Sequence, residues 1–245
     1  MTRYKIAIEY KGSAFSGWQR QLGIISVQQV IEEAIESFTG KTTKIFGSGR
    51  TDAGVHALNQ VAHFDLELEL PCYKVMTAIN HFVKPNPVVV YECSIVEDDF
   101  HARFSAKSRE YVYRILNRNQ PSAIYDELAW HVAKPLDAEA MHLAGQCLIG
   151  KHDFSAFRST HCQSHSPIKN LTSLIVKRTD DWVEIHISAP SFMHNQVRII
   201  TGCLVKVGTG SWPVEKVQQI LASRDRKLAA ATAPAHGLYL SKIKY

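Results

Sequence analysis

The sequence predicts an α+β protein made of two similar halves, each a ferredoxin-like unit. The chain has 245 residues, which suits one large domain or two small ones. Hydrophobic residues make up 45% and charged residues 21%, as in ordinary soluble globular proteins. Strand-like alternation and helical spacing then follow one another roughly as β-α-β-α-β, twice. We therefore expect an N-terminal half over residues 1–104 and a C-terminal half over residues 105–245.

The first half opens with an alternating strand and continues into an amphipathic helix. In residues 3–10, RYKIAIEY, apolar side chains fall on one face of a strand. Ser26 and Gln29 form a capping box before a helix-spaced apolar series, and Gly40 supplies its stop. The later elements expected in this half are a strand over 62–70, a helix over 73–83 and a strand over 88–96.

The second half repeats these signals and adds a hairpin. Its expected turn is Thr179–Asp181, between two alternating segments. The elements expected here are a strand over 109–116, a helix over 138–149, strands over 170–177 and 182–189, a long helix over about 194–207, a short helix after Pro213, and a final strand in GLYLSKIKY.

Composition and segment lengths narrow the class of protein. The opening MTRYKIAIEYKG reads as a strand and not as a signal peptide, and no apolar run is long enough to span a bilayer. The five cysteines are scattered without a CxxC pair, which is typical of reduced thiols. We expect a cytoplasmic protein without a membrane segment.

Positive charge is concentrated in the second half. Residues 1–100 carry nine Lys and Arg against 12 Asp and Glu, a net charge of −3, while residues 101–245 carry 19 against 11, a net charge of +8. Such asymmetry favours a polyanionic partner, nucleic acid first. A solvated basic face explains the charge equally well, so charge alone leaves the two interpretations even.

A group of histidines and one cysteine raises the question of a metal site. His152, His161, Cys162 and His165 lie within fourteen residues. Their spacing lacks the CxxC or HExxH pairs of established zinc sites. We expect a polar loop here, and no metal.

The stretch GSGRTDAGVHALNQVAHF, residues 47–64, contains one carboxylate, Asp52, among glycines. Glycines gather where a backbone bends sharply or where another backbone approaches closely. Arg50 stands two residues before Asp52, and a nearby guanidinium stabilises an ionised carboxylate. We interpret Asp52 as the principal candidate for catalysis.

Two further stretches combine basic residues with aromatic or apolar ones. If KSREYVYR (107–114) is a strand, Arg109, Tyr111 and Tyr113 share one face. Tyrosines on strands usually pack in a core, but an arginine on the same face favours a surface on which a nucleobase can stack, and we favour this role for Tyr111. Arg198 borders the apolar stripe of the long helix, as a surface arginine or as the partner of a carboxylate.

Six segments, in order along nearly the whole chain, resemble the tRNA pseudouridine synthase A (TruA) family. They are EYKGSAFSGWQRQ (9–21), SGRTDAGVHALNQVAHF (48–64), FHARFSAKSREYVYRI (100–115), HDFSAF (152–157), SFMHNQVRIITGCLVKVG (191–208) and APAHGLYLSKIKY (233–245). This resemblance implies the pseudouridine synthase fold. In that fold two ferredoxin-like, RRM-like halves form a mixed, largely antiparallel sheet flanked by helices, with a basic cleft between the halves.

The resemblance also implies an activity and residue roles. The family isomerises uridines at positions 38, 39 and/or 40 of the anticodon stem-loop to pseudouridine, without cofactor or metal. It acts as a homodimer, with the tRNA contacting both subunits. Matched residue by residue, Asp52 is the catalytic aspartate, acting as nucleophile or base. Tyr111 stacks on the target uracil, Arg198 pairs with the aspartate, and Arg50 contacts the extruded nucleotide.

Two other classes of function remain as alternatives. A non-catalytic structured-RNA-binding protein of the same fold would keep the basic and aromatic strips but would have no use for Asp52. A hydrolase using Asp52 would need a second carboxylate or base, and none stands at a recognisable spacing.

Overall fold

The computed structural model describes residues 1–160, 162, 164 and 166–245. The chain forms two compact units that do not follow each other simply in sequence. The first unit consists of Met1–Lys107 together with Leu240–Tyr245, and the second unit consists of Ser108–Tyr239. The last six residues, expected in the C-terminal half, are thus part of the first unit.

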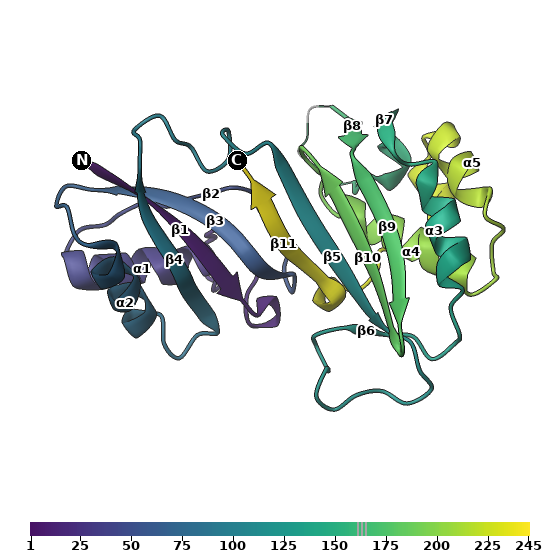
Figure 1. The fold of residues 1–245 in the computed structure, drawn as a ribbon, viewed down its shortest axis with the longest axis horizontal. Coiled ribbons are helices and arrows are strands. Elements are labelled where there is room, and N and C mark those ends of the chain that lie inside the picture. The colour runs from purple at the N-terminus through teal and green to yellow at the C-terminus, as the bar shows by residue number, and fades with distance from the viewer. Residues whose placement is uncertain (161, 163, 165) are drawn as a thin grey trace. The chain divides into compact units, whose positions relative to one another are not determined.

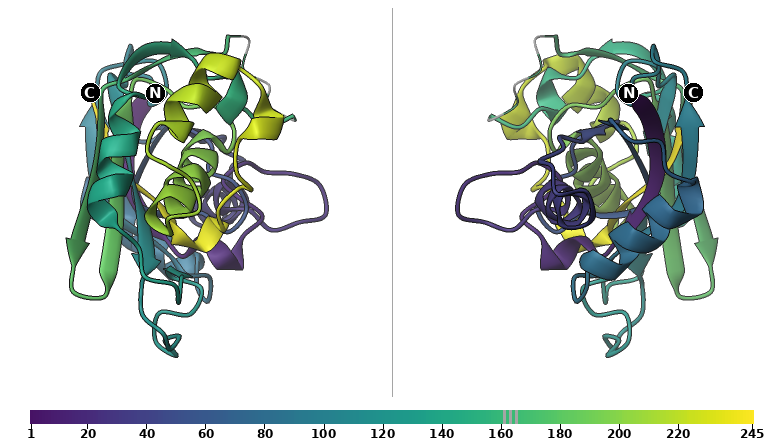
Figure 2. Two further views of the ribbon diagram at one scale, coloured as in Figure 1. Left: turned by 90° about the vertical axis from the view of Figure 1, so that its right-hand side faces the viewer. Right: turned by 90° about the vertical axis from the view of Figure 1, so that its left-hand side faces the viewer.

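The first unit is an antiparallel sheet with two helices on one face (Figures 1 and 2). β1 (Thr2–Tyr10) lies between β3 (His56–Leu66) and β4 (Val88–Val96) and pairs antiparallel with both. Its elements are β1 (Thr2–Tyr10), the short 3-10 helix η1 (Gly12–Ala14), α1 (Val27–Thr39), β2 (Phe46–Gly47), β3 (His56–Leu66), α2 (Cys72–Phe82) and β4 (Val88–Val96).

The predicted end signals of α1 are confirmed. The hydroxyl oxygen of Ser26 accepts a hydrogen bond from the backbone N–H of Gln29, at 3.3 Å. Gly40 ends the helix with φ +70°, a left-handed conformation that glycine adopts at little cost. In β1, Tyr4, Ile6 and Ile8 are fully buried, as their alternation predicts.

β3 was predicted to begin near residue 62, but it begins at His56 and ends at Leu66. The early start comes from pairing across the chain, because β3 follows β1 as far as Tyr10, opposite Ala57. The early end has the same cause, because Leu66 lies opposite Thr2, the first residue of β1, and beyond it the backbone of Leu70 bonds with the Tyr4 hydroxyl group instead. Tertiary contacts therefore set both ends of the strand.

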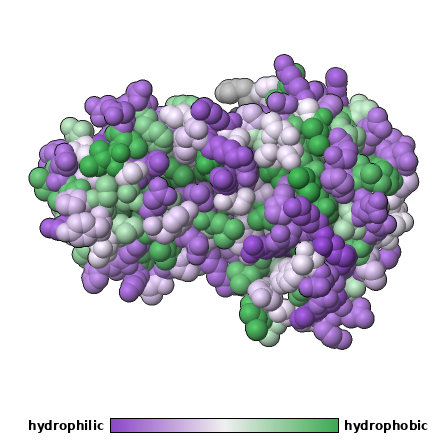
Figure 3. All heavy atoms as spheres, viewed as in Figure 1, coloured by the Kyte–Doolittle hydropathy of each residue, from purple (hydrophilic) through white to green (hydrophobic). Residues whose placement is uncertain are grey.

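The opposite face of the first unit's sheet is open on β4. There Val89 and Tyr91 are exposed, while Val88 and Val90 lie opposite the buried Tyr10 and Ile8 and are themselves buried. On the face drawn in Figure 3, hydrophobic residues are scattered among hydrophilic ones. Single exposed apolar residues of this kind are normal on a protein surface.

The second unit is also a sheet with its helices on one face (Figures 1 and 2). β10 lies between β5 and β9 and pairs antiparallel with both, β6 pairs parallel with β5, and β7 pairs antiparallel with β8. Its elements are β5 (Ser108–Leu116), β6 (Trp130–His131), α3 (Ala138–Gln146), β7 (Gly150–Asp153), η2 (Ser155–Phe157), β8 (Ile168–Leu171), β9 (Ser173–Thr179), β10 (Trp182–Ala189), α4 (Gln196–Gly208), α5 (Lys216–Ser223), η3 (Arg226–Leu228) and η4 (Ala235–Gly237).

Several boundaries in the second unit differ from the prediction. The strand expected over 170–177 is interrupted, because Thr172 directs its N–H and its hydroxyl group to the carbonyl of Ser188, at 2.8 and 3.0 Å. The helix expected over 138–149 ends at Gln146, and β6 and β7 were not predicted. The hairpin turn lies where expected, with Asp180 at φ +52°.

The final strand, β11 (Leu238–Lys244), belongs mainly to the first unit. Within that unit, the N–H of Lys107 donates to the carbonyl of Lys244 at 2.7 Å. The Tyr245 hydroxyl group donates to the carbonyl of Ala102 at 2.9 Å, and its ring packs 5.0 Å from that of Phe100. These contacts hold residues 240–245 against residues 100–107 of the first unit.

The predicted α+β class, with a mixed, largely antiparallel sheet flanked by helices, is confirmed. The first unit follows the predicted β-α-β-α-β order, whereas the second places four strands, β7 to β10, between α3 and α4. No helix in the described part of the chain has the length and apolar character needed to cross a bilayer.

Candidate functional site

Asp52 lies on a tight turn between β2 and β3 in the first unit. The carbonyl of Asp52 accepts a hydrogen bond from the N–H of Val55 at 3.1 Å, and Gly54 takes φ +79° within this turn. The carbonyl of Thr51 accepts from the N–H of Trp18, also at 3.1 Å. Asp52 itself is half-buried. The carboxylate is therefore carried on backbone that is fixed on both sides.

The turn is packed against a second glycine-bearing loop of the same unit. A Cβ added to Gly12 would lie 2.0 Å from the carbonyl oxygen of Val55, and one added to Gly17 would lie 2.7 Å from that of Thr51. Gly17 also takes φ +95°. Only glycine allows the two backbones to come this close. Gly12 and Gly17 thus belong to the site, although sequence reasoning did not single them out.

Aromatic residues form the support beneath this turn. The Tyr10 hydroxyl group lies 2.7 Å from the hydroxyl oxygen of Thr51, and both residues are buried. The ring of Tyr10 lies 6.2 Å from that of Trp18. A Cβ on Gly47 would meet the indole of Trp18 at 2.6 Å. The glycine at position 47 therefore makes room for an aromatic side chain of the support.

Buried polar side chains fix the segment leading to Asp52. The Ser48 hydroxyl group bonds with the side-chain oxygen of Gln60 at 2.6 Å, and the Gln60 amide donates to the carbonyl of Gly49 at 2.9 Å. Gln60 is fully buried and its bond with Ser48 forms away from water, where an unmade bond is costly. A run of polar residues inside an otherwise apolar strand was the available sequence signal for this role.

His56, the other titratable base in this stretch, has a structural role. It is buried, and its Nδ1 accepts a hydrogen bond from the N–H of Gly12 at 3.0 Å. A neutral imidazole that accepts at Nδ1 carries its proton on Nε2. The contact ties the start of β3 to η1 and strengthens the junction of the two loops.

Arg50 shares this loop with Asp52 and is exposed to solvent. The residue between them, Thr51, is buried. The loop therefore presents an accessible guanidinium two positions before the Asp52 carboxylate, and both residues belong to the first unit.

Tyr111 lies on β5 in the second unit, opposite Ile187 of β10. It is half-buried, and its ring meets that of Phe192 edge-on, with ring centres 5.3 Å apart. Arg109, on the same strand, donates to the carbonyl of Pro190 at 2.6 Å. Tyr111 is therefore held from one side and still partly accessible, as a stacking residue requires.

Tyr113, on the same face of β5, is a core residue. It is fully buried, its hydroxyl group donates to the carbonyl of Pro234 at 2.8 Å, and burial raises its pKa. A Cβ on Gly237 would meet its ring at 2.6 Å. The core interpretation thus applies to Tyr113, and only the part of the face near Tyr111 remains accessible.

Arg198 projects from the first turn of α4 in the second unit. Its Nε donates to the carbonyl of Ala233 and its Nη1 to the side-chain oxygen of Asn195, each at 2.8 Å. Asn195 takes the left-handed conformation at φ +61°, which directs the chain into the helix. Both acceptors are neutral, so these contacts orient the guanidinium without cancelling its charge.

Of the four residues expected at the site, Arg50 and Asp52 lie on one loop of the first unit, and Tyr111 and Arg198 lie in the second. His161 and His165 of the histidine group are outside the described residues. Within the described part of the chain, no three His, Cys, Asp or Glu side chains gather as a metal site would require.

Comparison with known proteins gives consistent results. Residues 6–105 and 144–245 match a family described as tRNA pseudouridine synthase. A tRNA pseudouridine synthase A of Parvibaculum lavamentivorans is 51% identical over all 245 residues, covering the whole of both chains. A tRNA pseudouridine synthase A of Maricaulis maris is 49% identical over 245 residues, covering the whole of this chain and 98% of the relative.

Proposed function

Because this chain belongs to the tRNA pseudouridine synthase family, we propose that it isomerises uridine in tRNA to pseudouridine. The observation that carries the proposal is the Asp52 turn, which is fixed by backbone contacts and glycine packing while its carboxylate stays only half-buried. The turn therefore holds a partly accessible carboxylate in a fixed position, which is what a group that acts on a bound nucleotide requires.

The reaction agrees with what the chain offers. The C1′–N1 bond of uridine breaks, the uracil turns, and C1′ joins C5, so the atoms are conserved and no electrons are gained or lost. The hydrogen on C5 is released as a proton, and N1 gains one. We propose that Asp52 starts this sequence, either by attacking C1′ or by taking a proton from the sugar. A carboxylate on a fixed turn meets the positioning requirement of both routes.

The other candidate residues have roles in holding the nucleotide. A base inside a folded RNA must be flipped out to expose C1′. We propose that Tyr111 then stacks on the uracil and that Arg50 contacts the extruded nucleotide. For Arg198 we propose pairing with Asp52, which would keep the carboxylate ionised. The partial exposure of Tyr111 and the exposure of Arg50 support these assignments.

We further propose the finer details implied by the family resemblance. The target uridines are those at positions 38, 39 and 40 on the 3′ side of the anticodon arm. The active form is a homodimer in the cytoplasm, with the tRNA contacting both subunits.

Asp52→Asn tests the proposal. The amide keeps the shape of the carboxylate but can neither attack C1′ nor accept the sugar proton. Release of tritium from tRNA labelled at uridine C5 should fall below detection, while a gel shift with the same tRNA should show binding retained. Asp99→Asn, which removes an exposed carboxylate from the same unit, is the matched control and should turn over normally.

Two outcomes would contradict the proposal. If Asp52→Asn released tritium at a tenth of the wild-type rate or more, the aspartate would be structural. If the wild-type protein bound tRNA but released no tritium, the alternative of a non-catalytic RNA-binding protein would be correct.

A further inference from the structure

A second group of aromatic and basic side chains lies in the first unit, apart from the Asp52 turn. The ring of Phe46 stacks on that of His63 at 5.1 Å, and His63 in turn meets His101 at 4.6 Å. His101 contacts the ring of Phe104 at 4.4 Å. Phe46 is 40% exposed and Phe104 is 75% exposed, so the outer rings of the group face solvent.

Two exposed cations accompany the exposed rings. Lys44 Nζ lies 5.5 Å from the centre of the Phe46 ring, and the Arg103 guanidinium carbon lies 5.7 Å from that of Phe104. Both side chains are exposed. Lys44, Phe46, His101, Arg103 and Phe104 are called the aromatic–basic surface below.

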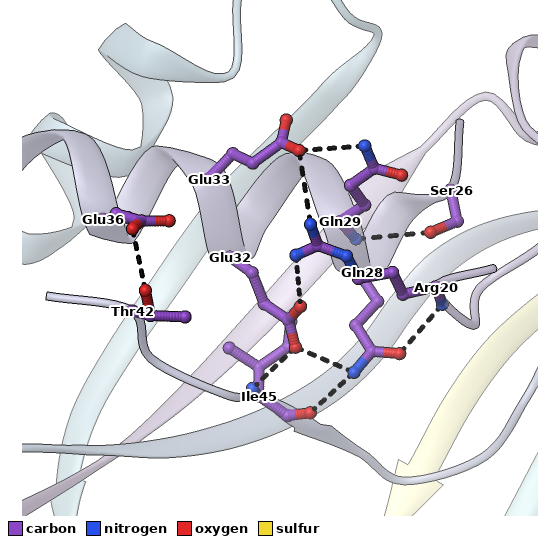
Figure 4. A network of polar contacts seen from close by, with 9 residues as sticks. All are labelled: Arg20, Ser26, Gln28, Gln29, Glu32, Glu33, Glu36, Thr42 and Ile45. Carbon is purple, nitrogen blue, oxygen red and sulfur yellow. Dashed lines mark hydrogen bonds and ion pairs between the residues drawn. The ribbon is translucent and has the colours of Figure 1, made fainter. Parts of the chain in front are cut away.

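The strand side of this surface is held in place by helix α1 (Figure 4). The buried Glu32 carboxylate accepts from the N–H of Ile45 at 3.2 Å, and Gln28 donates to the carbonyl of Ile45 at 3.2 Å. Glu32 also accepts from Gln28 at 2.8 Å and from Arg20 at 3.2 Å. Ile45 lies between Lys44 and Phe46, so the backbone carrying both is fixed.

The turn on the other side is fixed as well. The N–H of Ala102 donates to Nδ1 of the buried His63 at 3.2 Å. His101 and Ser105 exchange two bonds, one from the Ser105 N–H at 2.9 Å and one from the His101 N–H to the Ser105 hydroxyl oxygen at 3.0 Å. The exposed Phe104 is therefore carried on an ordered turn.

The two imidazoles are neutral at physiological pH. Burial, followed by the neighbouring His101, lowers the pKa of His63 to about 4. Burial also lowers the pKa of His101. The group thus offers uncharged rings for stacking, while Lys44 and Arg103 supply its positive charge.

We propose that the aromatic–basic surface binds unpaired nucleotides of the RNA substrate, with Phe104 and Phe46 stacking on bases and Lys44 and Arg103 contacting phosphates. This inference rests on the proposed function, because it takes the substrate to be RNA. Exposed aromatic rings combined with cations suit single-stranded nucleic acid, since every base has a face on which to stack. Arginine adds to this, because its guanidinium plane also stacks on bases. Phe46 precedes Asp52 by six residues, so one continuous stretch carries both candidate contacts.

The test compares RNA affinities of variants of the full chain by fluorescence anisotropy. The probes are a hairpin RNA with an anticodon stem and loop, and a blunt RNA duplex without unpaired bases. Phe104→Ala should weaken binding of the hairpin about fivefold or more and leave binding of the duplex unchanged. Phe104→Tyr keeps an aromatic ring and should bind the hairpin as the wild type does. Arg103→Gln should weaken binding of both RNAs and reduce the salt dependence of hairpin binding by roughly one phosphate contact.

Phe82→Ala is the matched control. Phe82 is 45% exposed and its ring lies 4.9 Å from that of His81, so it is another exposed phenylalanine beside a histidine in the same unit. Its substitution should not change RNA affinity. Hairpin affinity unchanged in Phe104→Ala, or lost equally in Phe82→Ala, would overturn the inference. The inference would also be overturned if Phe104→Ala dissociated a dimer that the wild-type protein forms in sedimentation velocity. The surface would then bind a second copy of the chain and not RNA.

Tritium release separates this inference from the proposed function. If the wild-type protein released no tritium but Phe104→Ala still weakened hairpin binding, the activity would be wrong and the binding surface right. With activity present, Phe104→Ala should raise KM and leave kcat nearly unchanged, because Phe104 is proposed to bind RNA and not to reach the reacting atoms.

Discussion

Gly12→Ala adds one methyl group at the closest approach of the two loops that form the Asp52 site. The new Cβ would lie 2.0 Å from the carbonyl oxygen of Val55 and 2.9 Å from the N–H nitrogen of His56. Contacts under 3.0 Å do not persist at a real Cβ, so one of the two backbones must move by about 1 Å. Val55 donates to the carbonyl of Asp52, so the movement passes to the aspartate.

The size of the effect follows from that displacement. A misplacement of about 1 Å in a catalytic group can cost about 100-fold in rate, and this is the expected loss of turnover. Overpacking should also cost about 1–3 kcal/mol of unfolding free energy. In a chain of this size the thermal midpoint should then fall by about 2–4 °C for each kcal/mol.

The assay is tritium release measured beside tRNA binding and thermal unfolding. Ser13→Ala, a change at the exposed neighbouring position in η1, is the control and should behave as wild type. The argument requires Gly12→Ala to lose turnover while its folded state persists below the lowered midpoint. Turnover within twofold of wild type would show that the catalytic geometry does not depend on this contact between the loops.

Three further expectations concern other parts of the chain. Tyr111→Phe should bind tRNA nearly as well as wild type, whereas Tyr111→Ala should lose about 1–3 kcal/mol of binding free energy in a gel shift; equal losses would show that the hydroxyl group matters more than the ring. The pKa of His63 is lowered to about 4 from 6.5, so the unfolded state binds more protons between these values. The unfolding free energy should therefore fall as the pH drops from 6.5 to about 4. In His63→Gln this dependence of unfolding free energy on pH should be weaker, as measured by urea titrations at several pH values. Tritium release should survive EDTA, and loss of activity that zinc restores would contradict the absence of a metal role.

Local signals in the sequence predicted the elements that are governed by local chemistry. Helix α1 begins after Ser26 and ends before Gly40 because a hydroxyl cap and a left-handed glycine act within a few residues. The capping box itself forms only in half, because the Gln29 side chain bonds with Glu33 in place of the Ser26 N–H. A competing partner one turn along the helix is enough to change such a detail.

Long-range contacts set the features that the sequence did not reveal. The start of β3 depends on its pairing with β1, and the break between β8 and β9 depends on Ser188. Asp52 could be singled out by its glycine-rich surroundings, but its support could not. Gly12 lies forty residues away in sequence, and nothing local distinguishes it from a glycine in an ordinary loop.

The division of the first unit has a consequence for how the protein is made. Residues 240–245, which bond with Lys107 and Ala102, are translated after the whole of residues 108–239. At about 5–20 residues per second, a ribosome needs roughly 7 to 28 s to travel from Lys107 to Tyr245. During that interval β1, β3 and β4 can pair, but the unit lacks its last strand segment. In the nascent chain the first unit therefore remains incomplete until the second unit has been synthesised.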